Sequence, residues 1–399
     1  MSRLRVTPDE ISGLTIFAPN FKPYRGGVAE YTYQLAWVLN NLGFLDRVIT
    51  TVPQERPSNY GFDVTSVRDE ESLQSERSFT RKIKDRLRSY WAFYTTFARR
   101  SETHVLATWI QGIEPKRFLM GCIKYDISFS VVLHGYDIVF LLKRDTSYLK
   151  EVCRQAEVLI FNSEATRELF SNRVFSPEQS HVLYPGINTT QLDAASKTST
   201  TVLEKCYDIE LRGKTVILSV ARLVERKGID IALNALAPIL DASDDYRYVI
   251  AGTGPEFDSL KSEVDRLGLA DKVKLTGEVS DTEKYGLLES SSLFLMPNHT
   301  CRGDDFEGFG ISFIEASYFE NVVIGGRSGG AVEAISEDVS GFLIDFEEGN
   351  REERLRELLR SLISQPERID ELSSQGRKYV IDNFRVSELI EDFWGDIKQ

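Results

Sequence analysis

Two glutamates, Glu307 and Glu315, stand eight positions apart on either side of a short glycine-rich stretch. Gly308 and Gly310 flank the aromatic Phe309 and let the backbone turn sharply, so that a ligand can approach the main chain closely. The apolar run that follows predicts a helix, whose first N–H groups would face an anion with the help of the helix dipole. Glu307 would then lie in the loop and Glu315 about two helical turns further on.

Paired carboxylates at a sugar site suggest glycoside hydrolysis, in which acid and base stand roughly 5 to 9.5 Å apart across one bond. Eight positions along a helix instead span about 12 Å. This spacing favours two carboxylates that hold hydroxyls on different parts of one long ligand, such as a nucleotide sugar. The alternative is a helix N-terminal turn with a partly buried glutamate and no ligand.

The second candidate group is cationic. Arg222 and Lys227 follow a predicted strand over 215–221 and precede a predicted helix. Arginine offers a planar fork to phosphate oxygens and lysine a compact point charge, so together they could hold a diphosphate and stabilise it as it leaves. The alternative is a solvated basic loop. Arg226 is expected to be a surface charge.

The amino-terminal half repeats the strand–loop–helix pattern. Gly26 and Gly27 fall between a predicted strand over 14–19 and a helix from about 28 to 42, and His134 ends another predicted strand. Open parallel sheets bind ligands at the carboxyl ends of their strands. Paired glycines at this edge can cradle a diphosphate or simply form a turn. A histidine there is either a ligand contact or a hydrogen-bonded loop residue.

Strands alternate with helices along the chain, which predicts two doubly wound α/β domains facing across a cleft. The expected first domain covers 1–186 and is completed by a carboxyl-terminal helix over 387–399. The expected linker covers 187–213, and the second domain covers 214–384. Closure of the domains about the linker would exclude water from the site.

The segment 304–316 resembles the Glu-x7-Glu signature of the retaining GT-B glycosyltransferases of family 4, and the similarity continues through 321–335. The Arg-x4-Lys-Gly pattern at 222–228, His-Gly-x-Asp at 134–137 and Gly-Gly at 26–27 also match that family. The resemblance implies a GT-B fold, with an acceptor-binding first domain and a second domain that binds a nucleotide sugar.

The resemblance also implies residue roles. Glu315 would bind the nucleotide ribose, and Glu307 the donor sugar. Arg222 and Lys227 would hold the diphosphate, and His134 would contact the donor sugar near the reacting carbon. The other implied donor-binding residues are Gly26 and Gly27 at the phosphates and the acceptor, Gly254 beside the nucleotide pocket, and the backbone N–H groups of Phe309, Gly310 and Ile311, with Asp137 as a further candidate.

The implied reaction moves a hexose of the mannose or glucose type from a nucleotide-diphosphate sugar to a hydroxyl of a glycan or glycolipid. Anomeric configuration would be retained by a front-face route, in which the leaving diphosphate helps take the acceptor proton. The stretch 302–333 looks particularly like bacterial mannosyltransferases that use GDP-mannose on lipid acceptors, although UDP-sugar enzymes share the motifs. No metal or other cofactor is expected, because His299 and Cys301 show no metal-ligand spacing to a further partner.

Two rival functions remain. A non-catalytic GT-B-like partner protein should lose the cations or the glutamates, and all four are present. A nucleotide-sugar 2-epimerase would bind the same donor without an acceptor. A nicotinamide dehydrogenase is disfavoured because Gly252-x-Gly254 has no third glycine to complete a dinucleotide fingerprint.

Composition excludes other classes. A net charge of −13 argues against nucleic-acid binding, and four widely spaced cysteines indicate a reducing compartment. No run of 18 apolar residues and no signal-peptide pattern occur, so we expect a cytoplasmic protein, either free or peripheral on the inner face of the membrane. The basic, aromatic stretch 81–100 is the candidate contact with an anionic membrane. Its alternative is a helix that packs its aromatics on the sheet.

Overall fold

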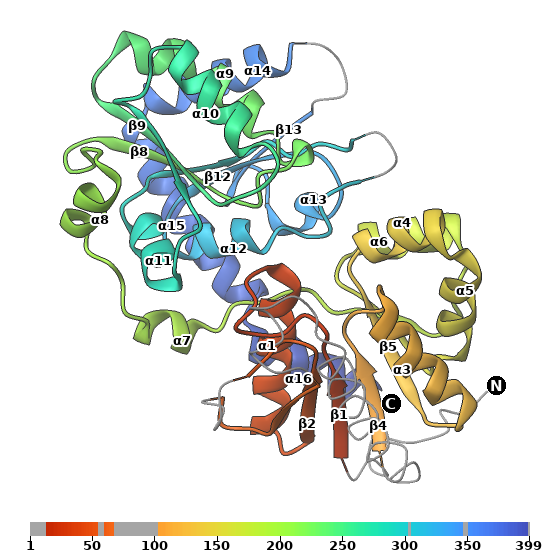
Figure 1. Ribbon diagram of the computed structural model, residues 1–399. Coiled ribbons are helices and arrows are strands. Elements are labelled where there is room, and N and C mark those ends of the chain that lie inside the picture. The colour runs from red at the N-terminus through yellow and green to blue at the C-terminus, as the bar shows by residue number, and fades with distance from the viewer. Residues whose placement is uncertain (1–12, 55–59, 68–102, 302–304, 346–349, 398–399) are drawn as a thin grey trace, which may run out of the picture. The chain divides into compact units, whose positions relative to one another are not determined.

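The computed structural model describes residues 13–54, 60–67, 103–301, 305–345 and 350–397. The chain forms two compact units, one over 1–186 together with 386–399 and the other over 187–385. Each unit is built around its own parallel sheet with flanking helices (Figure 1).

The first unit holds a seven-stranded sheet in the order β3-β2-β1-β4-β5-β6-β7. Its strands are β1 (Gly13–Phe17), β2 (Leu45–Thr50), β3 (Val64–Ser66), β4 (Thr103–Ala107), β5 (Phe129–Leu133), β6 (Leu159–Phe161) and β7 (Ser180–Val182). Its helices include α1 (Gly27–Asn41), α3 (Ile113–Lys124), α4 (Tyr136–Arg144), α5 (Thr146–Gln155) and α6 (Glu164–Arg173). Every residue of β5 is buried, as expected for a central parallel strand covered on both faces.

Two further features of the first unit are the cap of α6 and the last helix of the chain. The Ser163 hydroxyl accepts a hydrogen bond from the Thr166 N–H at 3.0 Å and so caps α6. The last helix, α16 (Val386–Ile397), belongs to the first unit. Its Trp394 ring lies 5.6 Å from that of Phe44, and its Phe393 ring lies edge-on to His181 at 5.7 Å.

The second unit holds a six-stranded sheet in the order β10-β9-β8-β11-β12-β13. Its strands are β8 (Thr215–Val220), β9 (Tyr246–Ala251), β10 (Val273–Gly277), β11 (Leu293–Met296), β12 (Val322–Gly326) and β13 (Gly341–Ile344). Its helices include α9 (Ile229–Ala242), α10 (Phe257–Arg266), α11 (Asp281–Glu289), α12 (Ile311–Tyr318), α13 (Ala331–Ala334), α14 (Arg351–Ile363) and α15 (Pro366–Asn383).

The range 187–213, expected as a linker, differs from that expectation in having helices of its own. It contains α7 (Thr189–Ala194) and α8 (Thr200–Tyr207) and is part of the second unit. The Tyr207 hydroxyl donates to Glu283 at 2.9 Å, and Lys197 pairs with Glu289 at 2.6 Å. These contacts attach the polar segment to α11, which its composition alone does not reveal.

Both sheets place their first strand inside the sheet, so the chain winds outward in both directions. This confirms two doubly wound α/β domains. The order reverses between β1 and β4 in the first unit and between β8 and β11 in the second. Ligands of such sheets bind at this switch point, beyond the carboxyl ends of the strands. The loops that follow β1, β4, β8 and β11 are therefore where a site is expected.

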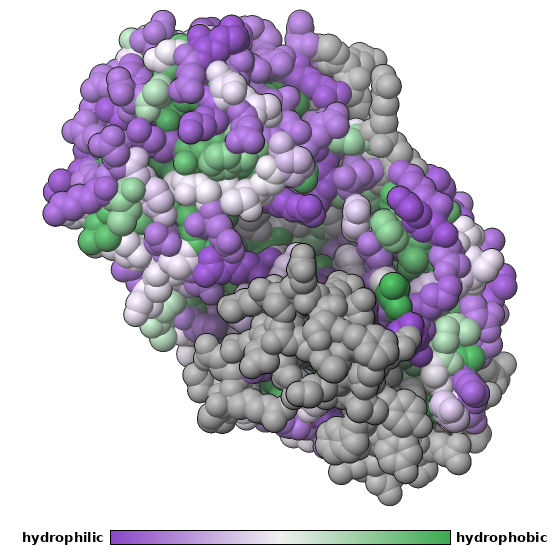
Figure 2. All heavy atoms as spheres, in the orientation of Figure 1, coloured by the Kyte–Doolittle hydropathy of each residue, from purple (hydrophilic) through white to green (hydrophobic). Residues whose placement is uncertain are grey.

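None of the helices in the described ranges combines the length and apolar character that crossing a bilayer requires. On the face seen in Figure 2, the second unit shows mainly hydrophilic side chains. The basic stretch 81–100 lies outside the described residues, so its predicted membrane contact stays a prediction.

Candidate active site

The loop after β8 begins the site in the second unit. It runs through Arg222 and a 3-10 turn, η3 (Glu225–Lys227), to α9. Gly228 has a φ of 66°, and a Cβ atom there would lie 2.2 Å from the Pro297 carbonyl oxygen. Only glycine fits this close approach, so the loops after β8 and β11 are held against each other at the switch point.

Glu307 lies at the centre of a buried ion cluster in that place. Its Oε2 atom accepts from Lys227 Nζ at 2.5 Å and from Arg226 Nη1 at 2.6 Å. The Arg226 Nε atom lies 3.2 Å from Asp305 Oδ1. Glu307 and Lys227 are each only 8% exposed. Two cations and two carboxylates thus neutralise one another within the cluster.

The protonation states follow from burial and charge. Burial alone would raise the pKa of Glu307, but the charges and hydrogen bonds of Lys227 and Arg226 outweigh it and hold that pKa below its ordinary value. Burial lowers the pKa of Lys227, and the opposing effect of Glu307 does not fully cancel this. The glutamate is therefore ionised at neutral pH and bound to both cations.

The prediction that Arg226 is a surface charge is wrong. Its side chain is only 19% exposed and contacts both Asp305 and Glu307. The sequence hides this role because the partners lie about eighty positions further along the chain and meet Arg226 only when the sheet has formed. Arg226 positions Glu307.

Arg222, in contrast, is exposed. Its side chain has no hydrogen-bond or ion-pair partner within the ranges that the structure describes. It stands at the carboxyl end of β8 as an available cation, whereas Lys227 is already paired. The two cations predicted to bind phosphate therefore differ before any ligand binds: Lys227 is buried in an ion pair, and Arg222 is exposed.

The glycine-rich turn leads from Glu307 into α12. Gly310 caps this helix with a φ of 95°, and Ile311 is the first helical residue. The Gly330 N–H donates to the Glu307 carbonyl oxygen at 2.8 Å, which fixes the turn. Phe309 is buried, with its ring 5.5 Å from that of Phe384, so its side chain packs in the core and only its backbone remains for a ligand.

Glu315, in α12, has a cation partner as well. Its Oε1 atom accepts from Lys284 Nζ of α11 at 2.7 Å, and only 8% of Glu315 is exposed. Each glutamate of the pair is therefore held by lysine, Glu307 by Lys227 and Glu315 by Lys284. Sequence reasoning missed Lys284, because it lies 31 positions from its partner in an ordinary polar helix.

Gly254 is required by packing. A Cβ atom at this position would lie 2.1 Å from the Leu223 carbonyl oxygen, so the turn after β9 is pressed against the loop after β8. Glycine there shapes the loop that carries Arg222. The prediction that it borders a nucleotide pocket stays a prediction.

In the first unit, Gly26 caps α1 and Gly27 is its first residue. His134 follows β5 directly and is 8% exposed. Its Nε2 atom lies 3.0 Å from the Thr108 carbonyl oxygen, which can only accept, so Nε2 carries the proton and Nδ1 is left as an acceptor. The Tyr31 ring stands edge-on to the imidazole at 5.2 Å.

Asp137 is fully buried and faces the backbone. Its carboxylate accepts from the N–H groups of His134 and Ile138, each at 3.0 Å. Burial raises the pKa of Asp137 to about 6, against these bonds. These bonds fix the turn that presents His134, and the predicted contact of Asp137 with a ligand stays a prediction.

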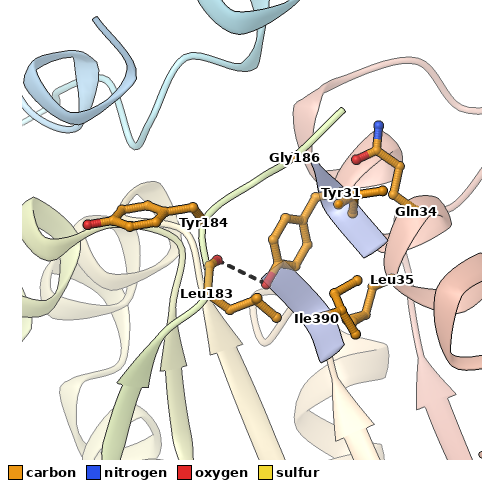
Figure 3. Close-up of a pocket in the computed structure, with 8 residues that line it drawn as sticks. Tyr31, Gln34, Leu35, Leu183, Tyr184, Gly186 and Ile390 are labelled. Atoms are coloured by element: carbon orange, nitrogen blue, oxygen red, sulfur yellow. Dashed lines mark hydrogen bonds between the residues drawn. The ribbon is translucent and has the colours of Figure 1, made fainter. Parts of the chain in front are cut away.

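A small pocket lies beside this turn, between α1, the segment after β7 and α16 (Figure 3). The Tyr31 hydroxyl donates to the Leu183 carbonyl oxygen at 3.3 Å across it. Leu35, Leu183 and Ile390 make the lining largely apolar. We regard the pocket as a packing gap. The hydrogen bond to Leu183 holds Tyr31 in place beside His134.

We predict that His134 stays neutral well below neutral pH. Burial lowers its pKa to about 4, so its neutral form contributes stability that is present above the unfolded value near 6.5 and is lost as the pH falls towards 4. Asp137 opposes this, since its raised pKa favours the folded state as the pH falls through about 6. Histidine NMR measures the effect directly: His134 should not titrate above pH 5, whereas titration near 6.5 would contradict this environment.

Comparison with known proteins identifies the family. Residues 209–379 match the family model for group 1 glycosyl transferases, and residues 25–191 match the model for glycosyltransferase family 4. The chain belongs to the group 1 glycosyltransferases. The two family matches fall on the second and first units respectively, so both halves of the chain contribute to the assignment.

Among related group 1 glycosyltransferases, a GDP-mannose-dependent alpha-(1-6)-phosphatidylinositol monomannoside mannosyltransferase of Mycobacterium tuberculosis is 33% identical over 261 residues. The alignment covers 64% of this chain and 66% of the relative, slightly less than two thirds of its length. The human alpha-1,3/1,6-mannosyltransferase ALG2 is 28% identical, with 64% of each chain covered.

Solved structures agree on the architecture. Anabaena Alr3699/HepE, solved in complex with UDP-glucose, has a TM-score of 0.71 at 18% identity and covers 95% of this chain and 97% of its own. Sucrose-phosphate synthase from Thermosynechococcus elongatus has a TM-score of 0.74 at 15% identity, covering 96% and 98%. These likenesses confirm the predicted GT-B fold.

Proposed function

We propose that this protein transfers a hexose from a nucleotide-diphosphate sugar to a hydroxyl of a glycan or glycolipid. The observation that carries the proposal is the pair of buried glutamate–lysine contacts at the switch point of the second sheet. Glu307 and Glu315 each offer carboxyl oxygens that can accept from sugar hydroxyls, and each has a cation within 2.7 Å.

In this proposal, donor binding changes the partners of Lys227 and Glu307 in the ion cluster. A diphosphate offers Lys227 a doubly charged acceptor in place of Glu307, and Arg222 supplies a second, exposed cation. Glu307, still held by Arg226, can then turn an oxygen towards a hydroxyl of the donor sugar. Glu315 would hold the ribose. Ground-state ion pairs thereby keep the site ordered until the donor replaces them.

The chemical step follows the front-face route. The bond from the anomeric carbon to the diphosphate oxygen breaks, the acceptor oxygen bonds to the same face of that carbon, and the acceptor proton passes to the departing diphosphate. Arg222, Lys227 and the first N–H groups of α12 stabilise the charge that develops on the leaving group. We therefore propose a metal-independent reaction that retains anomeric configuration.

The neutral His134 suits a contact with the donor sugar. Its Nε2 proton is committed to the Thr108 carbonyl, so Nδ1 would accept from a sugar hydroxyl. A group with a pKa of about 4 is a poor general base at neutral pH. Its contribution is therefore orientation of the sugar.

For the donor we favour GDP-mannose, because the named relatives include a GDP-mannose-dependent enzyme and the stretch 302–333 resembles such mannosyltransferases. A lipid-linked acceptor agrees with the basic, aromatic stretch 81–100, which we propose to contact an anionic membrane surface from the cytoplasmic side. Vesicle sedimentation tests this contact: Arg86→Gln with Arg88→Gln should weaken binding to anionic vesicles, and equal binding to neutral vesicles would contradict it.

The transfer reaction is tested with radiolabelled GDP-mannose and UDP-glucose, each offered with a mannosyl glycolipid in anionic vesicles and with a soluble oligosaccharide. We expect a labelled product with one donor, in EDTA as in magnesium, and an α-anomeric signal in its NMR spectrum. Release of an epimerised free sugar without acceptor would instead favour the 2-epimerase. Nucleotide binding without any product would favour the non-catalytic partner.

We predict that Arg222→Ala weakens donor binding without changing stability. The side chain is exposed and unpaired among the described residues, so the free energy of unfolding should change by less than about 0.5 kcal/mol. Loss of one charge-assisted hydrogen bond to phosphate should weaken nucleotide affinity by about 10- to 100-fold. Calorimetric titration measures the affinity, with Arg266→Ala, an exposed arginine of α10, as the matched control. Equal affinity of the two variants would remove Arg222 from the site.

A further inference from the structure

A second cluster of ligand-type side chains lies next to the glutamate–cation site. Glu225 belongs to η3, and His299 and Cys301 follow β11. One ligand atom from each lies within 4.8 Å of the other two. The His299 N–H donates to the Arg226 carbonyl oxygen at 2.9 Å, which brings the two segments together. The sequence pattern concealed the cluster, because Glu225 is remote from the other two residues in the chain.

The geometry of the inner pair matches metal ligation. Cys301 Sγ lies 3.6 Å from His299 Nε2. Zinc bonds of about 2.3 Å to sulfur and 2.0–2.1 Å to nitrogen, at a tetrahedral angle, place the two atoms about 3.6 Å apart. Glu225 is exposed, so its carboxylate is free to rotate onto a shared ion. Water would supply the fourth position, as it does in sites with three protein ligands.

The charges around the pair favour a cation. Glu225, Asp230 and Asp305 act electrostatically on His299 or Cys301, against Arg226 and Arg351. With Cys301 as a thiolate, these groups sum to a net charge of −2. The His299 Nδ1 atom is buried, and the ring interacts with the Pro297 backbone as well as with Cys301.

We propose that Glu225, His299 and Cys301 bind a zinc-class divalent cation that takes no part in the transfer chemistry. Thiolate, imidazole and carboxylate together suit zinc and its neighbours, whereas magnesium and calcium prefer oxygen ligands alone. The site lies beside the cluster that holds Glu307: Arg226 follows Glu225 directly, and the Cys301 N–H donates to the Asp305 carbonyl oxygen at 3.0 Å. A bound cation therefore clamps η3 to the segment that leads to Glu307.

Cobalt spectroscopy tests the site without any activity measurement. The full-length chain is treated with chelator, dialysed and titrated with Co²⁺, and the near-ultraviolet thiolate-to-cobalt charge-transfer band is recorded. We expect a band that saturates at one equivalent and is displaced by Zn²⁺. Cys301→Ser should abolish it, while His299→Ala and Glu225→Gln should each weaken the apparent affinity about tenfold or more, since even outer-shell partners contribute that much.

The matched control is Cys206→Ser, which removes an exposed cysteine elsewhere in the second unit and should keep the band. Thermal unfolding of metal-free Cys301→Ser, equal to that of the metal-free wild type, shows that the variant is folded. Lys227→Met should also keep the band, which separates this site from the proposed transfer function. Absence of the band in the wild type, or its survival in Cys301→Ser, would overturn the proposal and leave a simple thiol–imidazole hydrogen bond.

Discussion

Replacing Glu307 with glutamine is expected to abolish most transfer activity and to destabilise the second unit. Lys227 and Arg226 would lose the carboxylate that they share in a nearly dry site, and removing one partner of a buried pair costs about 3–5 kcal/mol. Glutamine keeps the shape and one acceptor oxygen, so we expect the lower end of this range. Because Glu307 is proposed to orient the donor sugar, kcat/KM should fall by at least about 100-fold.

Urea unfolding and initial rates measure the two effects separately. Glu289→Gln is the matched control, because Glu289 forms an exposed ion pair with Lys197 in the same unit. That change should cost less than about 1 kcal/mol and leave the rate unchanged. A Glu307→Gln enzyme with wild-type stability would mean that the cluster does not form, and wild-type activity would remove Glu307 from the site.

Lys227→Met should also have a large effect, but it should affect the reaction more than the stability. Glu307 would retain Arg226, so the loss of stability should be smaller than for Glu307→Gln. The loss of activity should be large, because Lys227 is proposed to bind the diphosphate of the donor and to stabilise the same diphosphate as it leaves. We expect kcat/KM to fall by about 10²- to 10³-fold and nucleotide affinity by about 10- to 100-fold.

Lys197→Met provides the comparison, since it removes a lysine from an exposed ion pair in the same unit. Nucleotide titration and initial rates should match the wild type in that variant. If Lys227→Met lowered stability but left nucleotide affinity unchanged, Lys227 would be a structural partner of Glu307 alone. Comparing stability and nucleotide affinity in Glu307→Gln and Lys227→Met therefore shows whether Lys227 only pairs with Glu307 or also binds the phosphates.

The sequence was sufficient for the framework of the site. Buried strands followed by glycine-bearing loops predicted two doubly wound sheets, and the loop after β8 and the start of α12 were placed from local pattern alone. Local pattern works there because a strand, a turn and a helix cap depend on neighbours within a few positions. The cap formed by Ser163 is an example, since its partner Thr166 lies three residues away.

The contacts inside the site could not be predicted from local sequence patterns. Arg226 and Lys284 look like ordinary charges on a turn and a helix, and their partners Glu307 and Glu315 come from a distant segment. Parallel sheets bring such segments together by crossover connections, so the pairing is set by topology. Asp137 shows a local contact instead: its carboxylate accepts from backbone N–H groups within three residues, and its predicted ligand contact stays a prediction.

The central claim is that the second unit binds a nucleotide-diphosphate sugar through Lys227 and Arg222. Thermal unfolding with UDP, GDP, ADP and their common sugars, each in EDTA or magnesium, tests it most directly. Ligand at one hundred times its dissociation constant adds about 2.7 kcal/mol to the free energy of unfolding. We predict stabilisation by one nucleotide class, unchanged in EDTA and much reduced in Lys227→Met. Wild-type protein that no nucleotide stabilises, or equal stabilisation of Lys227→Met, would contradict the claim.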